Sequence, residues 1–300
     1  MLSVLIPSYN HASYIEQAID SARRISVPGK RIVIIDDAST DETAAVIEEN
    51  LRRHGAEGID FIRKPQNRGA IDSVLTFLAM CRTEYVYFMA SDDIAIGDGV
   101  GRLVAMLEAR NSLQFVIGGG SNLLPDGTTT PLYGRKHARL FGHPPEALVE
   151  ALFLTDPSPL LCQSSVFRLR AIEAVNGFDP ALVADDFTLF TRLFKRFHHR
   201  GVDFEFAPEV DCVRYRHHGS NSYRNLPRQA SSHRQVILAN SPERLRTKAA
   251  GYKLAFFALV AAKRRDRRSL LQIARMTTLS ESPWFVIGLF ANAINWLRLR

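Results

Sequence analysis

Apolar runs and helical repeats alternate along the first ninety residues of the chain. Short apolar runs, each typical of a buried strand, cover residues 2–7, 31–35, 59–63 and 85–89. The segments between these runs carry apolar residues at helical spacing. Strands that alternate with helices in this way predict parallel βαβ units with right-handed crossovers. The pattern therefore predicts an α/β fold with a Rossmann-like, mostly parallel central sheet flanked by helices.

The pattern becomes mixed after residue 102. The elements expected there are a helix over 103–109, a strand over 114–117, a glycine turn at 118–120, a surface loop over 125–145, helices over 144–153, 169–175 and 186–197, and strands over 164–168, 203–206 and 210–215. Beyond Pro227 only helices are expected. These changes divide the chain into three parts, 1–102, 103–226 and 227–300, and the last part is a helical appendage.

Polar side chains follow three of the predicted strands, at the point where each strand ends. They form the clusters Ser-Tyr-Asn at 8–10, Asp-Asp at 36–37 and Asp-Asp at 92–93. Ligand-binding residues of parallel sheets gather at the carboxyl ends of the strands, which meet at one edge. The sequence therefore predicts one site at that edge.

Asp92 and Asp93 are candidate ligands of Mg²⁺ or Mn²⁺, because these hard cations prefer carboxylate oxygens. A bound metal would act as a Lewis acid on a leaving diphosphate. An isolated Asp-Asp pair is more often explained by a turn or a helix cap than by a metal site. The other polar clusters at strand ends favour the metal site here. His217 and His218 follow a predicted strand, and one of them is a candidate third metal ligand, although a lone histidine is more often a surface residue.

Asp36 and Asp37 can accept hydrogen bonds from a base edge or a ribose hydroxyl, and the alternative for them is helix capping. Tyr9 adds a ring that could stack on a base, although a core tyrosine is the commoner case. In the second half, Asp185 and Asp186 open a predicted helix. One of these two acids suffices as a cap, which leaves the other as a candidate general base.

The distribution of charge along the chain bears on the kind of partner that the protein binds. The formal net charge is +7, and the basic excess lies beyond Arg214, which favours an anionic partner or a solvated helix face. The three cysteines, at 81, 162 and 212, form no CxxC pair. This spacing argues against a zinc site or a disulfide framework and suits a reducing compartment. The expected location is therefore the cytoplasm.

Two apolar stretches of the tail, 252–262 and 283–297, end beside basic residues. Each is shorter than the ~20 apolar residues that a spanning helix needs. Both suit helices on the inner face of an anionic membrane, with Trp284 and Trp296 near the headgroups and Arg298 and Arg300 on lipid phosphate. The alternative is that they pack on the catalytic part or on a second copy of the chain.

The ordered motifs resemble those of family 2 glycosyltransferases with the GT-A fold. Over about the first 225 residues the chain reads IPSYN at 6–10, IDDASTDET at 35–43, NRG at 67–69, SDD at 91–93, GFD at 177–179, DD at 185–186 and YRHH at 215–218. The resemblance implies an inverting transferase without a covalent intermediate. It would move a sugar from a nucleotide-sugar, by family habit a UDP-sugar, to a hydroxyl of a glycan or glycolipid in cell-envelope polysaccharide synthesis.

The resemblance also implies residue roles at the nucleotide. Pro7, Tyr9 and Asp37 would hold the nucleotide. Asp36 would support them, and Arg68 is a weaker candidate for the same pocket.

At the diphosphate, Asp92 would contact the ribose or the metal, and Asp93 the metal or the diphosphate. His218 matches the family's histidine at the metal–diphosphate end, and Asp186 matches the catalytic base. The family's Asp-x-Asp often begins with an acid where this chain has Ala90, so the residue that binds the metal directly is left open between Asp92 and Asp93.

Other functions fit less well. A sugar nucleotidyltransferase would carry a glycine-rich basic loop after the first strand, where this chain has Ser-Tyr-Asn-His at 8–11. A non-catalytic nucleotide- or glycan-binding protein on the same scaffold would not need Asp93 and Asp186, and both are present. No recognised module supports nucleic acid as a partner.

Overall fold

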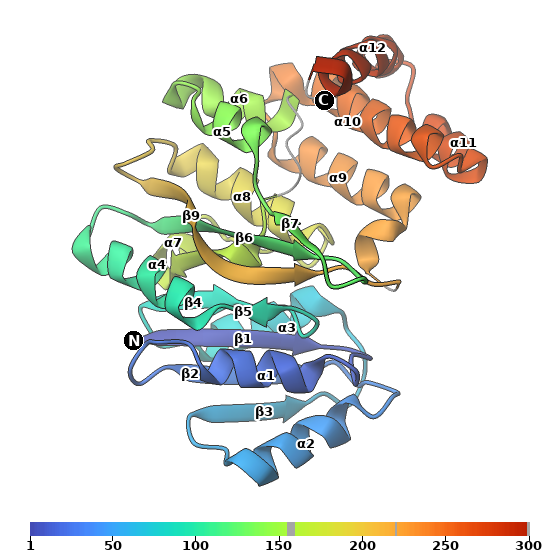
Figure 1. The fold of residues 1–300 in the computed structure, drawn as a ribbon. Coiled ribbons are helices and arrows are strands. Elements are labelled where there is room, and N and C mark those ends of the chain that lie inside the picture. Colours follow the sequence, from blue (N-terminus) through green and yellow to red (C-terminus); the bar gives the residue numbers. More distant parts are fainter. Residues whose placement is uncertain (155–159, 220, 299–300) are drawn as a thin grey trace.

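The computed structural model describes residues 1–154, 160–219 and 221–298, without the side chains of 185, 222 and 295–298. Its first part alternates strand and helix as predicted (Figure 1). The elements are β1 (Leu2–Ser8), α1 (Ile15–Arg23), β2 (Arg31–Asp36), α2 (Thr43–His54), β3 (Ile59–Arg63), α3 (Ala70–Met80) and β4 (Tyr85–Phe88). Strands β3, β2, β1 and β4 pair in parallel, which confirms the predicted βαβ units.

The second part completes one nine-stranded sheet in the order β3-β2-β1-β4-β8-β6-β9-β5, with β7 on β6. Its elements are β5 (Ile94–Ala95), α4 (Gly97–Ala109), β6 (Phe115–Leu123), β7 (Thr129–Pro131), α5 (Arg135–Phe141), α6 (Pro145–Leu154), β8 (Ser165–Arg168), α7 (Leu169–Glu173), α8 (Asp185–Arg196) and β9 (Phe204–Arg216), with short 3-10 helices at Cys162–Ser164 and Ser222–Arg224. Strand β8 is antiparallel to both β4 and β6, whereas β6 and β9 are parallel. The sheet is therefore parallel in its first half and mixed beyond β4.

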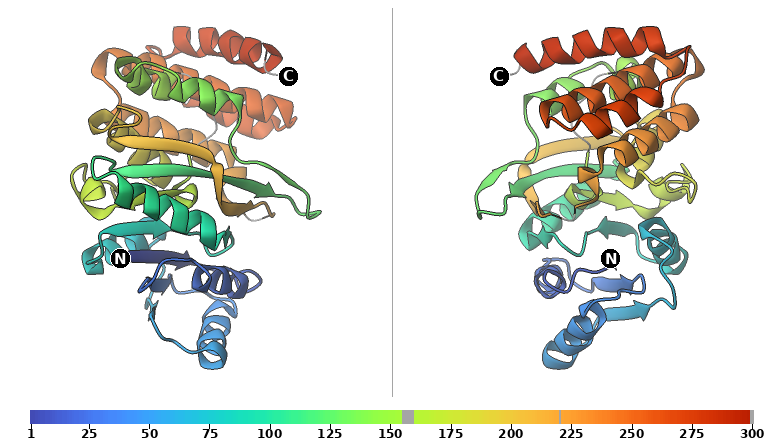
Figure 2. Two further views of the ribbon diagram at one scale, coloured as in Figure 1. Left: turned by 60° about the vertical axis from the view of Figure 1, so that its left-hand side comes forward. Right: turned by 90° about the vertical axis from the view of Figure 1, so that its right-hand side faces the viewer.

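Helices cover both faces of this sheet, so the molecule is layered (Figure 2). One apolar core joins the sheet to α1 and α4 through side chains such as Ile19 and Leu103. The other joins it to α3 and α8 through side chains such as Phe77 and Leu189. Burying each side chain of this size contributes about 1.5–3 kcal/mol, so the two cores together hold the strand ends that carry the polar clusters.

Gly118–Gly120 lie inside strand β6 and not in the turn expected from the sequence. Strand β9 runs beside them with two register shifts. A Cβ atom at Gly119 would lie 1.9 Å from the carbonyl oxygen of Pro208, and one at Gly120 would lie 2.2 Å from that of Val213. The glycines therefore permit a close approach of two strands, which local sequence does not distinguish from a turn.

The stretch 125–145 contains β7 and α5 and is more regular than the expected surface loop. Tyr133 between them is buried, and its hydroxyl lies 2.6 Å from Ser164 Oγ. The two strands expected over 203–206 and 210–215 form the single strand β9, because its pairing with β6 resumes at Asp211 after skipping residues 208–210. A bulge of this kind is set by the partner strand.

The tail is a helical appendage, as expected. It consists of α9 (Leu226–Asn240), α10 (Glu243–Lys263), α11 (Arg267–Arg275) and α12 (Ser282–Arg298). Helix α10 lies in its middle, and much of the apolar stretch 252–262 is buried against the other helices. Gly251 lets α12 approach, because a Cβ atom there would lie 2.8 Å from the Cβ of Trp284. Within the described part of the chain, no helix combines the length and apolarity needed to span a bilayer.

Candidate active site

The three polar clusters predicted at strand ends lie at one edge of the sheet. Strand β1 pairs with both β2 and β4, so the loops that follow these strands are neighbours. The loops open onto a cavity of about 530 Å³, whose lining includes Tyr9, Asp37, Asp92 and, from the second half of the chain, Asp186. This volume is typical of small-molecule sites. The edge therefore holds a cavity that both halves of the chain build.

Asp37 lines this cavity and is held by three donors. Its Oδ1 accepts hydrogen bonds from the Lys64 ammonium and the Arg68 backbone N–H, both at 3.0 Å. Its Oδ2 accepts one from the Gly69 N–H at 2.6 Å. Lys64 is buried and also contacts Asp72 Oδ2 at 2.6 Å. The sequence analysis missed Lys64, although it directly follows β3 as the other polar clusters follow their strands.

The Arg68 side chain is exposed and is not part of the cavity lining, so Arg68 contributes its backbone N–H. Asp36 is fully buried and shapes the loop after β2. Its carboxylate accepts hydrogen bonds from the Ser39 N–H at 3.0 Å and the Ser39 hydroxyl at 2.5 Å. Ala38 in this loop has φ of 58°, which non-glycine residues adopt rarely. Asp36 therefore positions the loop that carries Asp37.

Hydrogen bonds join the loop after β1 to the loop after β2. Asn10, with φ of 53°, donates its N–H to Ser39 Oγ at 2.9 Å and accepts from the Thr40 N–H at 2.8 Å. The His11 N–H donates to Thr43 Oγ1 at 2.8 Å. These contacts fix the backbone from which the His11 side chain projects.

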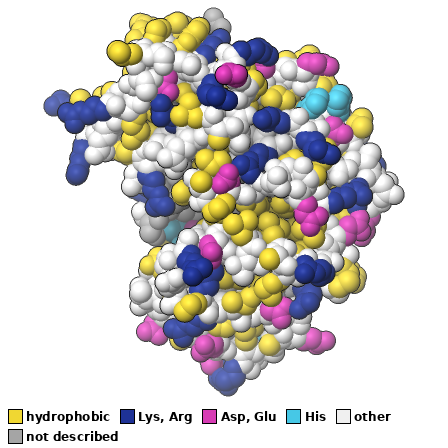
Figure 3. Space-filling model, turned by 180° about the vertical axis from the view of Figure 1, so that it is seen from behind, with side chains coloured by type: hydrophobic (Ala, Val, Ile, Leu, Met, Phe, Trp, Pro, Cys, Tyr) yellow, Lys and Arg dark blue, Asp and Glu magenta, His cyan; other side chains and the backbone are white. Residues whose placement is uncertain are grey.

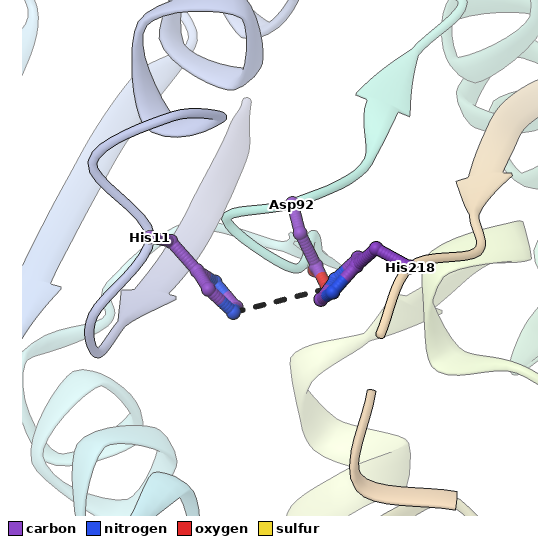
Figure 4. A group of neighbouring side chains, drawn as sticks. All are labelled: His11, Asp92 and His218. Atoms are coloured by element: carbon purple, nitrogen blue, oxygen red, sulfur yellow. Dashed lines mark hydrogen bonds and ion pairs between the residues drawn. The ribbon is translucent and has the colours of Figure 1, made fainter. Parts of the chain in front are cut away.

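Three side chains from separate segments bring metal-binding atoms together (Figure 4). They are His11 after β1, Asp92 after β4 and His218 after β9. Asp92 Oδ2 lies 2.8 Å from His218 Nε2 and 4.0 Å from His11 Nε2. All three ligand atoms lie within 4.8 Å of one another. Imidazole and carboxylate ligands in this proximity fit a divalent cation, and His11 adds to the ligands expected from the sequence.

Neighbouring groups orient these ligands. Ser91 Oγ lies 2.7 Å from His11 Nδ1, and Asn221 Nδ2 lies 3.2 Å from His218 Nε2. Burial lowers the pKa of His11, and this effect opposes the nearby Asp92 carboxylate, which raises it. The His11 imidazole is therefore neutral near pH 7, which is the form that binds a metal.

Asp93, the other expected metal ligand, is not part of this group of described residues. Its side chain is 1% exposed, and its Oδ1 accepts a hydrogen bond from the Arg216 N–H at 2.8 Å. Arg216 Nε in turn donates to the Asp92 carbonyl oxygen at 2.8 Å. Burial and the Asp92 carboxylate raise the pKa of Asp93 well above its usual range. Asp93 thus ties the end of β9, which leads to His218, to the loop after β4.

Asp186 lines the cavity from the first turn of α8. Its Oδ1 accepts a hydrogen bond from the Cys162 N–H at 2.8 Å. Burial raises the pKa of the Tyr215 phenol, and the charges of Asp93, Asp186 and Asp92 raise it further, so acids from both halves surround this ring. The side chain of the preceding acid, residue 185, lies outside those described.

The remaining nucleotide candidates, Pro7 and Tyr9, both line the cavity, and Tyr9 is 42% exposed. The lining also includes Arg228 from helix α9, which the sequence analysis placed in the tail and did not connect with the site. Its basic neighbours in the sequence give no signal that separates it from the other tail arginines. Arg228 reaches the cavity because α9 packs beside the catalytic half.

Residues 3–144 match the family described as Glycosyl transferase family 2. The chain is 25% identical over 245 residues to chondroitin synthase of Escherichia coli. This match covers 79% of this chain and 32% of that protein. It is 32% identical over 148 residues to TuaG of Bacillus subtilis, whose name assigns it to teichuronic acid biosynthesis. This match covers 49% of this chain and 54% of that protein. The chain thus spans between about a third and a half of the length of these relatives.

Solved structures share the fold. TarS (1–349) of S. aureus in complex with UDP-GlcNAc has a TM-score of 0.59 at 15% identity, over 96% of this chain and 79% of that chain. Mannosyltransferase PcManGT from Pyrobaculum calidifontis in complex with GDP-Man and Mn²⁺ also has a TM-score of 0.59, at 17% identity, over 98% of this chain and 79% of that chain. The likeness confirms the expected GT-A fold. In the sequence of residues 3–144 and in its fold, the chain is therefore similar to family 2 glycosyltransferases.

Proposed function

We propose that this protein transfers a sugar, with inversion, from a UDP-sugar to a hydroxyl of a cell-envelope glycan or glycolipid. One observation carries the proposal: a single cavity is lined by Asp37 at one strand end, by Asp92 at another and by Asp186 from the second half of the chain. Relatives named for chondroitin and teichuronic acid support a polysaccharide product, and the solved complex with UDP-GlcNAc supports the base.

The nucleotide would bind at the loops after β1 and β2. Tyr9 presents an exposed ring on which a base can stack. Asp37 is already fixed by three donors, so it can accept a further hydrogen bond from a base or ribose without losing its position. The Lys64 ammonium, 3.0 Å from Oδ1, holds this carboxylate in position.

Asp92, His218 and His11 would hold the divalent cation that the family fold implies. When bound, such an ion supplies Lewis-acid stabilisation of the departing diphosphate. A set with two imidazoles and one carboxylate favours Mn²⁺ over Mg²⁺, because Mg²⁺ prefers oxygen ligands. Arg228 lines the same cavity and adds a fixed positive charge for the diphosphate.

In the transfer step, the acceptor oxygen attacks the anomeric carbon from the side opposite the diphosphate. The new carbon–oxygen bond forms as the bond to the diphosphate oxygen breaks, and the nucleoside diphosphate leaves with that electron pair. Asp186 takes the acceptor proton, and the Cys162 N–H holds its carboxylate for this role. Because one displacement occurs, the configuration at the anomeric carbon inverts.

The alternative is a non-catalytic nucleotide- or glycan-binding protein, or less plausibly a sugar nucleotidyltransferase. The cavity counts against the first, because Asp186 would have no role in binding alone. The loop after β1 counts against the second, because Tyr9, Asn10 and His11 stand where a glycine-rich phosphate loop would be.

A thermal-shift screen of UDP, GDP, dTDP and CMP, each with and without Mn²⁺, tests the proposal. A ligand at a hundredfold excess over its Kd stabilises a fold by about 2.7 kcal/mol. We expect UDP to stabilise the protein in a Mn²⁺-dependent way, and Asp92→Asn and His11→Gln to remove the dependence on Mn²⁺. Stabilisation by none of the nucleotides would contradict the nucleotide site, and unchanged Mn²⁺ dependence in both variants would contradict the metal ligands.

The proposal extends to peripheral contact with the inner face of an anionic membrane. Helix α12 exposes an apolar patch of Val286, Ile287, Phe290 and Ile294, which are 51%, 45%, 68% and 47% exposed. Figure 3 shows hydrophobic side chains gathered at this end of the molecule, with Lys and Arg side chains nearby. Such a face with flanking cations suits an anionic lipid surface.

Of the two expected tryptophan anchors, Trp284 is not part of this patch. Trp284 packs against Tyr252 of α10, with the Lys248 ammonium 5.2 Å from the centre of its ring. The side chains of Trp296 and Arg298, and all of Arg300, lie outside the described residues. The membrane proposal therefore rests on the patch of α12.

A further inference from the structure

A second cavity, of about 380 Å³, lies between the catalytic half and helices α9 and α10. Its walls are mainly apolar and come from both sides. They include Leu161 and Phe190 from the catalytic half and Phe256, Phe257 and Val260 from α10. The volume is in the range of small-molecule sites. Because the tail forms half of the wall, the cavity depends on this chain's own appendage.

The second cavity adjoins the candidate base. Tyr215 lines both cavities. Phe187, which lines the second cavity, directly follows Asp186, and Leu161 precedes Cys162, whose N–H holds the Asp186 carboxylate. The second cavity therefore borders the first at Tyr215, next to the segments that carry and hold Asp186.

The charges at this cavity have one sign. Its lining consists of described residues and contains Lys253 and Arg264 but no Asp or Glu. Lys253 is 7% exposed, and its ammonium lies 5.4 Å from the centre of the Phe187 ring. Burial, with the Lys253 charge, lowers the pKa of His233 to about 3, so His233 adds no charge near pH 7.

The rim carries more positive charge. Tyr223 lines the cavity, and burial raises the pKa of its phenol against the opposing effect of the nearby Arg224 and Arg264 charges. Arg264 is exposed and follows the end of α10. The apolar side chains of the interior suit a hydrocarbon chain better than a chain of free sugars, whose buried hydroxyls would each need a hydrogen-bond partner.

We infer that this cavity binds the apolar end of the acceptor, a hydrocarbon chain joined to its sugar through an anionic phosphate. The hydrocarbon chain occupies the apolar interior, the phosphate pairs with Arg264 at the rim, and the sugar extends past Tyr215 to Asp186. This inference rests on the proposed function, because it assigns the substrate class of the same transfer.

Decyl phosphate, kept below its micelle concentration, serves as the probe for isothermal titration calorimetry. Inorganic phosphate and neutral decyl glucoside are its comparators. Val260→Trp fills the cavity, and Leu259→Trp is the matched control, because it lies one residue away on α10 and is not in the lining. We expect decyl phosphate to bind at least tenfold more weakly to Val260→Trp than to the wild type, and Leu259→Trp to bind it normally.

Arg264→Gln tests the phosphate contact. We expect this variant to weaken decyl phosphate several-fold and to leave decyl glucoside unchanged. Equal binding of decyl phosphate to the wild type and Val260→Trp would overturn the inference, and so would inorganic phosphate binding as tightly as the decyl ester. Loss of binding in Phe290→Ser would also overturn it, because the probe would then occupy the patch of α12.

Stabilisation by UDP and Mn²⁺ is measured on the same samples. Its persistence in Val260→Trp shows that the variant is folded, so that weaker binding of decyl phosphate reports the cavity. If UDP and Mn²⁺ fail to stabilise the wild type, the proposed function is contradicted. The binding of decyl phosphate measured by calorimetry tests the second cavity independently.

Discussion

Asp92 and Asp93 are adjacent acids with different surroundings. Asp92 meets His218 at 2.8 Å at the cavity, whereas Asp93 is 1% exposed and bound to the Arg216 backbone. Both acids lie in the turn between β4 and β5, where the Asp93 N–H donates to the Ala90 carbonyl oxygen at 3.2 Å, and the two carboxylates have different partners. From these surroundings we propose Asp92, and not Asp93, as the metal ligand.

Asp186→Asn isolates the proton-transfer role. The amide keeps the size of the side chain but cannot take the acceptor proton, so we expect kcat to fall by about 10²–10⁴-fold. The Kd for UDP with Mn²⁺ should stay within about twofold of the wild-type value, because a base acts in the chemical step. Rate measurements and a nucleotide titration on the same preparation give both numbers.

Asp126→Asn is the control for this variant. Asp126 is exposed in the turn between β6 and β7, and it is not in the lining of either cavity. The Asp126→Asn variant should retain the wild-type kcat. A loss of nucleotide affinity in Asp186→Asn as large as the loss of kcat would show that Asp186 serves binding and is not the base.

At the scale of elements, β6 and β9 depend on glycine for their close pairing. Gly119→Ala would place a methyl group 1.9 Å from the Pro208 carbonyl oxygen. Overpacking of this kind costs about 1–3 kcal/mol, because the strands must move apart. We expect a clear fall in Tm by calorimetry. Gly134→Ala, which meets nothing within 4 Å, is the matched control and should change Tm little.

The sequence predicts those elements whose signal is local. The alternation over residues 2–88 is confirmed because each strand and helix carries its own periodicity. The strand position of Gly118–Gly120 could not be predicted locally, because the close neighbour that requires glycine there is β9, some ninety residues later. The site positions of His11 and Arg228 could not be predicted for the same reason. A loop and a distant helix bring these residues to the cavity, and no local sequence pattern indicates it.

At the scale of the whole molecule, the patch on α12 predicts lipid contact. Removing one Phe side chain from an apolar surface costs about 1.5–3 kcal/mol, so Phe290→Ser should weaken binding to phosphatidylglycerol vesicles roughly tenfold or more. Vesicle co-sedimentation measures this effect. Val202→Ser is the control, because Val202 is 55% exposed and lies outside the patch.

Two results would contradict lipid contact. One is equal binding of the wild type and Phe290→Ser to the vesicles. The other is a wild-type dimer in solution that Phe290→Ser dissociates, since the patch would then join two copies of the chain.

Helix α9 touches both cavities, with Arg228 at the first and Gln229 at the second. The family match ends at residue 144, yet the walls of the two cavities extend to Arg264. Recombination between relatives that joins segments near residue 225 would therefore divide one functional unit between two parents. With the proposed acceptor site, the boundary at which acceptor preference could be exchanged intact lies after α10, because α9 and α10 form part of that site.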